Sequence, residues 1–123
     1  MELSRWIECI EESLKGFADF DYQRKAWYEG SIPGVVDSFV ESVCTFFGYD
    51  IDEGLSEWHD DIQPDVLRAL QRFRDEFGRF LENTKDDPKI DLDPHSDPRW
   101  PRIVELAQNV LSEAKEKGWY SKK

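Results

Sequence analysis

The chain has 123 residues, of which 35% are charged and 14% are aromatic, and its formal net charge at pH 7 is -11. This length suits one domain that buries a core without disulfides or metal, and eight Phe, five Trp and four Tyr argue against a disordered chain. The acidic excess disfavours nucleic acids and anionic membranes as partners and favours basic proteins, although acidity can also serve solubility alone.

The acidic excess belongs to the first half of the chain. Residues 1–65 hold 16 acids and 4 bases, whereas residues 66–123 hold 11 acids and 12 bases. No apolar run approaches the roughly 18 residues of a membrane span, and the amino terminus carries acids within its apolar pattern, unlike a signal peptide. We therefore expect a cytoplasmic protein with no membrane contact and no nucleic-acid partner.

Two helices are predicted before residue 30. Apolar residues recur at helical spacing from Leu3 to Phe17 with acids on the other face, which predicts an amphipathic helix of about four turns that stops near Gly16. A second, shorter helix is expected over residues 19–29, with an aspartate, Asp19 or Asp21, as its cap.

The next apolar pattern spans residues 35–47. Its β-branched valines leave a strand as an alternative, but the apolar positions follow helical spacing rather than strict alternation. We predict a third helix that ends at Gly48 in a left-handed conformation. Its expected inward-facing residues are Val35, Val36, Phe39, Val40, Val43, Phe46 and Phe47.

The strongest helical pattern begins at Pro64, a first-turn proline with Asp61 or Gln63 as the cap, and runs to Leu81. Ion pairs four residues apart are expected on its outer face. These pairs are Arg72–Glu76 and Asp75–Arg79.

A polar loop with two prolines follows over residues 83–97 and is expected at the surface. The last helix is expected to start with Asp97 as its cap and Pro98 at its first position, and to stop at Gly118. Two cysteines, Cys9 and Cys44, lie in apolar helical patterns, which favours two free core thiols over a disulfide.

Together, these predicted helices indicate an all-α protein, a single compact helical domain of four to five helices over residues 1–123. No convincing strand pair is present. The acidic segment 50–61 and the polar loop 83–97 are expected as surface excursions.

The acidic segment, DIDEGLSEWHDD, gathers six acids around one tryptophan and contains no Lys or Arg. An aromatic anchor among carboxylates suits a basic protein partner, because the aromatic ring contributes affinity and the acids steer the approach. A solvated loop with a core tryptophan has the same composition, and residues 85–97 are a second candidate face. The candidate partner-binding residues are Asp50, Asp52, Glu53, Glu57, Trp58, Asp60 and Asp61.

Signals for metal binding and catalysis are weak. Asp50, Asp52 and Asp61 match calcium-loop positions, but Leu55 stands where that loop needs glycine. The two histidines, His59 and His95, lack a second His or Cys at ligand spacing and are expected at the surface. Neither a nucleophile elbow nor a phosphate-binding glycine loop is present, and paired catalytic carboxylates stay an open alternative in a chain with 27 acids. We expect no enzymatic activity, no cofactor and no metal.

Two motifs stand out together, DYQRKAWYEG at residues 21–30 and DPRWPRIVELA at residues 97–107. In this order they resemble a family of small bacterial proteins with a D-Y-Q-R/K-x-x-W-x-x-G signature, an acidic middle segment and a terminal D-P-x-W helix. That family is similar to immunity proteins of contact-dependent and polymorphic toxin systems. The scaffold residues implied by the resemblance are Asp21, Tyr22, Gln23, Trp27, Gly30, Asp97, Pro98 and Trp100.

The resemblance implies an inhibitor that binds and neutralises a cognate toxin domain, which in such systems is often a basic nuclease. That expectation agrees with the uneven charge of the chain. The alternative from another functional class is a non-enzymatic regulatory or scaffold module that binds a different cytosolic protein. In either case we expect a monomer or a weak homodimer.

Overall fold

The computed structural model describes residues 2–29, 38–87, 89–90 and 93–121. In these residues the fold is all-α, as predicted, and the one β-type pairing is an isolated bridge between Ile62 and Tyr120. None of the described helices is long and apolar enough to cross a membrane. The elements are α1 (Leu3–Phe17), α2 (Phe20–Gln23), the π-helix η1 (Arg24–Glu29), α3 (Phe39–Gly48), α4 (Ile51–Glu57), α5 (Pro64–Thr84), the 3-10 helix η2 (Pro94–Ser96) and α7 (Trp100–Lys117).

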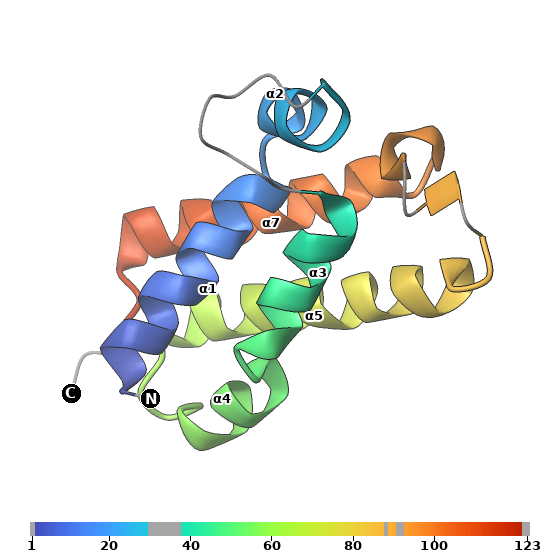
Figure 1. The fold of residues 1–123 in the computed structure, drawn as a ribbon. Helices are drawn as coiled ribbons and strands as arrows, with labels where there is room; N and C mark the ends of the chain where they lie inside the picture. The colour runs from blue at the N-terminus through green and yellow to red at the C-terminus, as the bar shows by residue number, and fades with distance from the viewer. Residues whose placement is uncertain (1, 30–37, 88, 91–92, 122–123) are drawn as a thin grey trace.

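The long helices α5 and α7 run antiparallel and pack along their lengths, and α1 lies against α7 (Figure 1). Helix α3 packs beside α1. The two short helices lie at opposite ends of α3, with α2 near its start and α4 just after its end (Figure 1). Helix α4 therefore sits at one extremity of the bundle.

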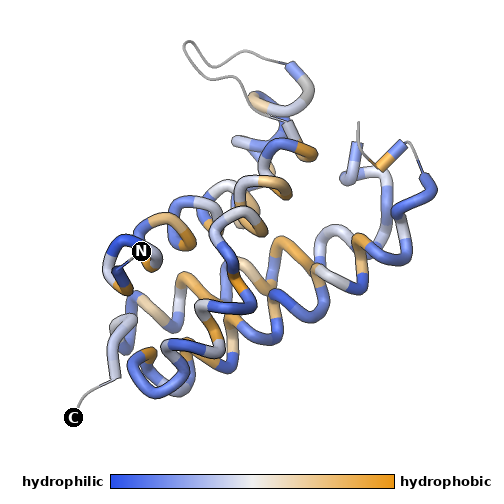
Figure 2. The backbone as a smooth tube through the Cα atoms, turned by 60° about the horizontal axis from the view of Figure 1, so that its bottom comes forward, coloured by the Kyte–Doolittle hydropathy of each residue, from blue (hydrophilic) through white to orange (hydrophobic). Residues whose placement is uncertain are grey.

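The core is one continuous cluster of apolar side chains drawn from all the long helices. Hydrophobic and hydrophilic bands alternate along α5 in Figure 2, as expected for a helix with one buried face. Phe17 of α1 lies at the centre, with its ring centroid 5.8 Å from Phe46, 5.9 Å from Phe73 and 5.0 Å from Phe77. Each such fully buried side chain stabilises the fold by about 1.5–3 kcal/mol.

Helix starts follow the predicted caps at two places. Of the two candidate aspartates before α2, Asp19 is the cap, because its side chain accepts a hydrogen bond from the N–H of Tyr22. Before Pro64, the side chain of Gln63 accepts from two N–H groups of the first turn of α5, so Gln63 and not Asp61 is the cap.

The start of α7 differs from the prediction. The helix begins at Trp100, and Asp97 is not its cap. The Asp97 carboxylate instead accepts hydrogen bonds from the backbone N–H and the guanidinium of Arg99, which holds the turn before the helix. Gly118, with φ of 81°, ends α7 as predicted.

Helix α3 ends at Gly48 as predicted, but the mechanism of the ending is different. Gly48 is not left-handed, and the residue with a positive φ (54°) is Asp50, which forms the cap position of α4. The reversal of the chain is therefore made two residues later, by an aspartate, a residue type that tolerates this conformation better than most.

The burial of α3 was only partly predicted. Phe39 and Phe46 face the core, but Val40 is 44% exposed and Cys44 is also exposed. The expected burial of Val40 and of a core thiol at Cys44 is therefore wrong, because α3 packs through one of its two apolar sides. Both cysteines are free thiols, and Val35 and Val36 lie outside the described residues.

The segment predicted as a polar loop contains helical residues and residues packed against the body. Helix α5 continues to Thr84, and Ile90 and Pro94 are buried against the body. On the outer face of α5 the Arg72–Glu76 pair forms at 3.8 Å. The other expected pair, Asp75–Arg79, is not among the ion pairs of the described residues.

Candidate protein-binding site around α4

The two sequence motifs meet at the side chain of Gln23, which is fully buried. Its Nε2 donates to the carbonyl oxygens of Gly16 and Phe17, each at 2.9 Å. Its Oε1 accepts from the indole Nε1 of Trp100 at 3.1 Å and lies 2.6 Å from Nε2 of His95. Every hydrogen-bonding position of the amide is used, so these motif residues hold α2 against α7 and are structural.

His95 was expected at the surface, and that prediction is wrong. The imidazole is half-buried between Gln23 and the ring of Phe20, whose centroid lies 5.0 Å away. Burial lowers the pKa of His95 below its ordinary value, and the nearby Asp93 carboxylate opposes this effect. The other histidine, His59, is exposed as predicted.

The acidic segment is built on a helix and not on an irregular excursion. Ile51 and Leu55 of α4 are buried in the core cluster, and Gly54 lies directly under the indole of Trp6. The opposite side of α4 carries Asp52 and Glu53, both exposed. Three of the predicted acidic positions, Asp52, Glu53 and Glu57, are therefore displayed on a helix.

One of the predicted binding residues is already neutralised within the chain. Asp52 makes a bidentate ion pair with Arg74 of α5, with Nη2 and Oδ2 3.0 Å apart. The hydrogen bond from Arg74 lowers the pKa of Asp52 and raises that of the guanidinium. The guanidinium also lies over the ring of Phe47, 5.9 Å from its centroid. Sequence reasoning missed Arg74 because it is 22 positions away.

The remaining acids of α4 surround a small cleft. Trp6 and Trp58, whose ring centroids are 5.2 Å apart, line this cleft, and its volume is about 140 Å³. Asp50, Glu53 and Glu57 line its edge, and within the described part of the chain none of the three has an ion-pair partner. Trp58 is only partly buried, so it serves both the core and the surface.

The other two predicted acids lie in the turn after α4. Asp60 is exposed, and its carboxylate is 3.3 Å from Nε2 of His59. Asp61 is partly exposed, and its carbonyl oxygen accepts a hydrogen bond from Ser121, which docks the C-terminal tail beside the turn. We call Asp50, Glu53, Glu57, Trp58, Asp60 and Asp61 the acidic surface; Asp52 is left out because of its pair with Arg74.

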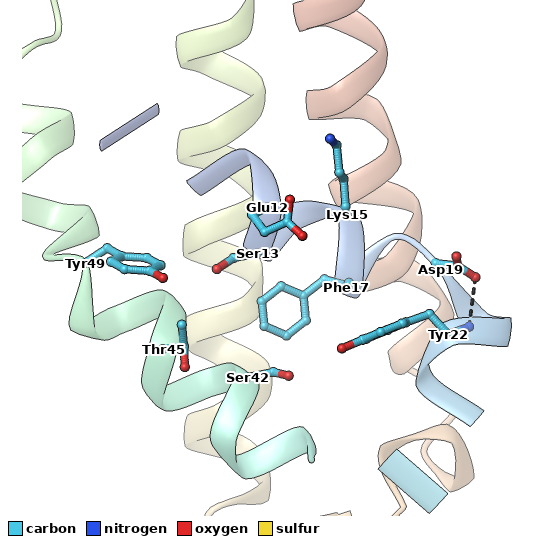
Figure 3. Close-up of a pocket in the computed structure, with 10 residues that line it drawn as sticks. Glu12, Ser13, Lys15, Phe17, Asp19, Tyr22, Ser42, Thr45 and Tyr49 are labelled. Atoms are coloured by element: carbon cyan, nitrogen blue, oxygen red, sulfur yellow. Dashed lines mark hydrogen bonds between the residues drawn. The ribbon is translucent and has the colours of Figure 1, made fainter. Parts of the chain in front are cut away.

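A larger cleft of about 310 Å³ lies between α1, α2 and α3. Figure 3 shows the side chain of Tyr22 of α2 pointing toward Phe17 of α1 and Ser42 of α3. Tyr49 lines both this cleft and the smaller one, and burial, with a smaller effect of Cys9, raises the pKa of its phenol. None of the described residues that line this cleft is a histidine or cysteine, so these walls offer hydroxyls and charges but no group with an ordinary pKa near neutrality.

The described residues contain no group of three or more His, Cys, Asp or Glu side chains placed to hold a metal ion. No protein-family model matches the chain, and no curated protein or solved structure is significantly similar to it.

Proposed function

We propose that the protein is an immunity-type inhibitor that binds a basic toxin domain through the acidic surface. The observation that carries this proposal is the set of three carboxylates, on Asp50, Glu53 and Glu57, that line the same small cleft as two indoles and lack a cationic partner among the described residues. Like charges spaced three and four residues apart along a helix repel one another, and a cationic partner relieves that repulsion.

The chemistry of the cleft matches a lysine or arginine side chain. The aliphatic stem of such a residue packs on the exposed part of Trp58, and its charged head reaches Glu53 and Glu57. A nuclease binds its substrate through cationic residues. Covering these residues with carboxylates blocks access of the nucleic acid, so inhibition needs no catalytic group on this chain.

The direct test is calorimetric titration against the carboxy-terminal domain encoded immediately upstream of the gene, at two salt concentrations. We expect a dissociation constant on the order of nanomolar and weaker binding at the higher salt, since salt screens exposed charges. Expression of the protein should also rescue growth of cells that produce that domain. If there is neither binding nor rescue, the inhibitor proposal is wrong. The alternative function, a regulatory or scaffold module that binds a different protein, then replaces it.

The role of the acidic surface is tested with the double variant Glu53→Lys/Glu57→Lys. Both side chains are exposed, so the fold should be unaffected, while the association rate should fall by about tenfold or more. The matched control is Asp86→Lys/Glu116→Lys, which makes the same change of net charge at two other exposed positions. An equal fall of the association rate in the two double variants would show that only net charge matters and that the acidic surface is not the binding site.

A further inference from the structure

The larger cleft and the small cleft meet at Tyr49, which follows the last residue of α3 and is the one described residue that lines both. Trp6, which lines the small cleft, donates from its indole Nε1 to the carbonyl oxygen of Tyr49 at 2.9 Å. In Figure 3, Tyr49 lies at one end of the larger cleft and Tyr22 at the other. The two clefts therefore adjoin, and we call them together the α1–α3 groove, which extends from Trp58 to Tyr22.

The α1–α3 groove follows two neighbouring antiparallel helices (Figure 1). Helix α1 contributes Trp6 to the small cleft and Gly16 to the larger one, whereas α3 leads back from Ser42 in the larger cleft to Gly48 in the small one. At a helical rise of about 1.5 Å per residue, the distance from Trp6 to Gly16 along α1 is about 15 Å. This is the length of about four or five residues of extended chain.

Hydroxyl groups from three helices line the larger cleft. Ser13 of α1, Tyr22 of α2 and Thr45 of α3 each contribute one. The backbone of an extended segment makes no hydrogen bonds within itself, so its N–H and C=O groups need partners elsewhere. Because a hydroxyl can both donate and accept, these walls suit the backbone of an extended segment.

The charge of the α1–α3 groove is acidic in both of its clefts. Besides the three carboxylates that line the small cleft, Glu12 and Asp19 line the larger one. Glu12 takes part in no ion pair within the described part of the chain. Lys15 is the one cation among the described lining residues, and Figure 3 shows its side chain pointing away from Thr45. The whole groove therefore favours a segment that carries Lys or Arg over an acidic one.

We propose that the α1–α3 groove holds an extended segment of the basic toxin domain, with a Lys or Arg side chain in the small cleft and the adjoining residues crossing Tyr49 into the larger cleft; this inference rests on the proposed function. The interface then includes α1 and α3 as well as α4. Hydrogen bonds to the backbone of the segment contribute affinity, and the carboxylates select a basic sequence.

A thiol at position 45 tests whether the larger cleft is occupied, because Thr45 is exposed and lies on α3, outside the acidic surface. In a Cys9→Ser/Cys44→Ser/Thr45→Cys variant we would measure the alkylation rate of this thiol alone and with a saturating amount of the upstream-encoded toxin domain. We expect the rate to fall by about tenfold or more in the complex, since an interface excludes solvent from the positions it covers. The control is Ser112→Cys in the same background. Ser112 is exposed on α7, which lines neither cleft, and its rate should not change.

The outcomes separate this inference from the proposed function. If calorimetry shows a complex and the thiol at position 45 reacts as fast as in the free protein, the inference is wrong and the proposed function stands. Protection that appears without the partner and grows with protein concentration would identify a second copy as the occupant and would also overturn the inference. Absence of any complex refutes the proposed function, and this inference with it.

Removing one charge from the larger cleft separates its contribution from that of α4. Glu12→Gln changes an exposed side chain to one of the same size, so the fold should be unaffected. We expect the dissociation constant to rise by about two- to fivefold, as for the loss of one exposed ion pair. The matched control is Glu116→Gln, which makes the same change of net charge at an exposed position of α7. Equal dissociation constants for these two variants would contradict the inference.

Discussion

Replacing Gln23 with leucine should destabilise the protein strongly, because the buried amide is the link between α2 and α7. Leucine has a similar volume but leaves two buried groups without their partner, the indole N–H of Trp100 and the carbonyl oxygen of Phe17. Each unsatisfied buried group costs about 1–3 kcal/mol. Together they predict a loss of about 2–6 kcal/mol in the free energy of unfolding, which is large for a domain with a total of about 5–15 kcal/mol.

The assay is urea denaturation followed by far-ultraviolet circular dichroism. Gln108→Leu is the matched control, because the Nε2 of Gln108 also donates to a carbonyl at the end of α1, that of Ala18 at 2.9 Å, but in an exposed position. Water can replace that bond, so the control should lose less than about 1 kcal/mol. If Gln23→Leu lowered the free energy of unfolding no more than Gln108→Leu does, the argument that this amide joins the two motifs would be refuted.

Two further predictions concern α4 and His95. Gly54→Ala should lower the free energy of unfolding, measured by urea denaturation, by about 1–3 kcal/mol, because the added Cβ overlaps the buried indole of Trp6. The control Gly48→Ala, with open space around its Cβ, should be neutral or slightly stabilising. Equal effects of the two substitutions would contradict this prediction. The pKa of His95 is lowered on folding, so its contribution to stability is complete above the ordinary pKa of about 6.5 and is lost as pH falls toward the lower folded value. As pH falls below about 6.5, the urea midpoint should therefore fall more steeply in the unchanged protein than in His95→Gln. Equal slopes in the two proteins would contradict the lowered pKa of His95.

Helical periodicity predicted most of the core, because it reports directly on which side of a helix is buried. In α5 the predicted residues Val66, Leu70 and Phe73 are all fully buried. Prediction was weaker for α3, where two apolar sides lie on one short helix and the sequence does not say which one meets the core. Phe39 and Phe46 face inward and Val43 packs against the core, whereas the expected burial of Val40 is wrong.

Contacts between distant segments were beyond the reach of the sequence. The acidic composition around α4 correctly drew attention to a charged surface, but nothing local shows that Asp52 is held by Arg74. Likewise, His95 has the sequence surroundings of a loop residue, and only the fold brings it to Gln23. Such pairs depend on how helices cross, and a single sequence gives no direct measure of that.

Five cations of the second half are held near acids on α5 and α7, which leaves the charge of the surface uneven; they are Arg68, Arg72, Lys85, Arg102 and Lys117. Lys117 lies 2.6 Å from Asp65, and Arg102 lies 3.4 Å from Glu76. Among the described residues, Arg74 is the one cation paired with an acid of α4. These five cations would have to leave their present partners to neutralise α4. A basic partner would neutralise α4 without such a change, and this supports the proposal that the acidic surface binds one.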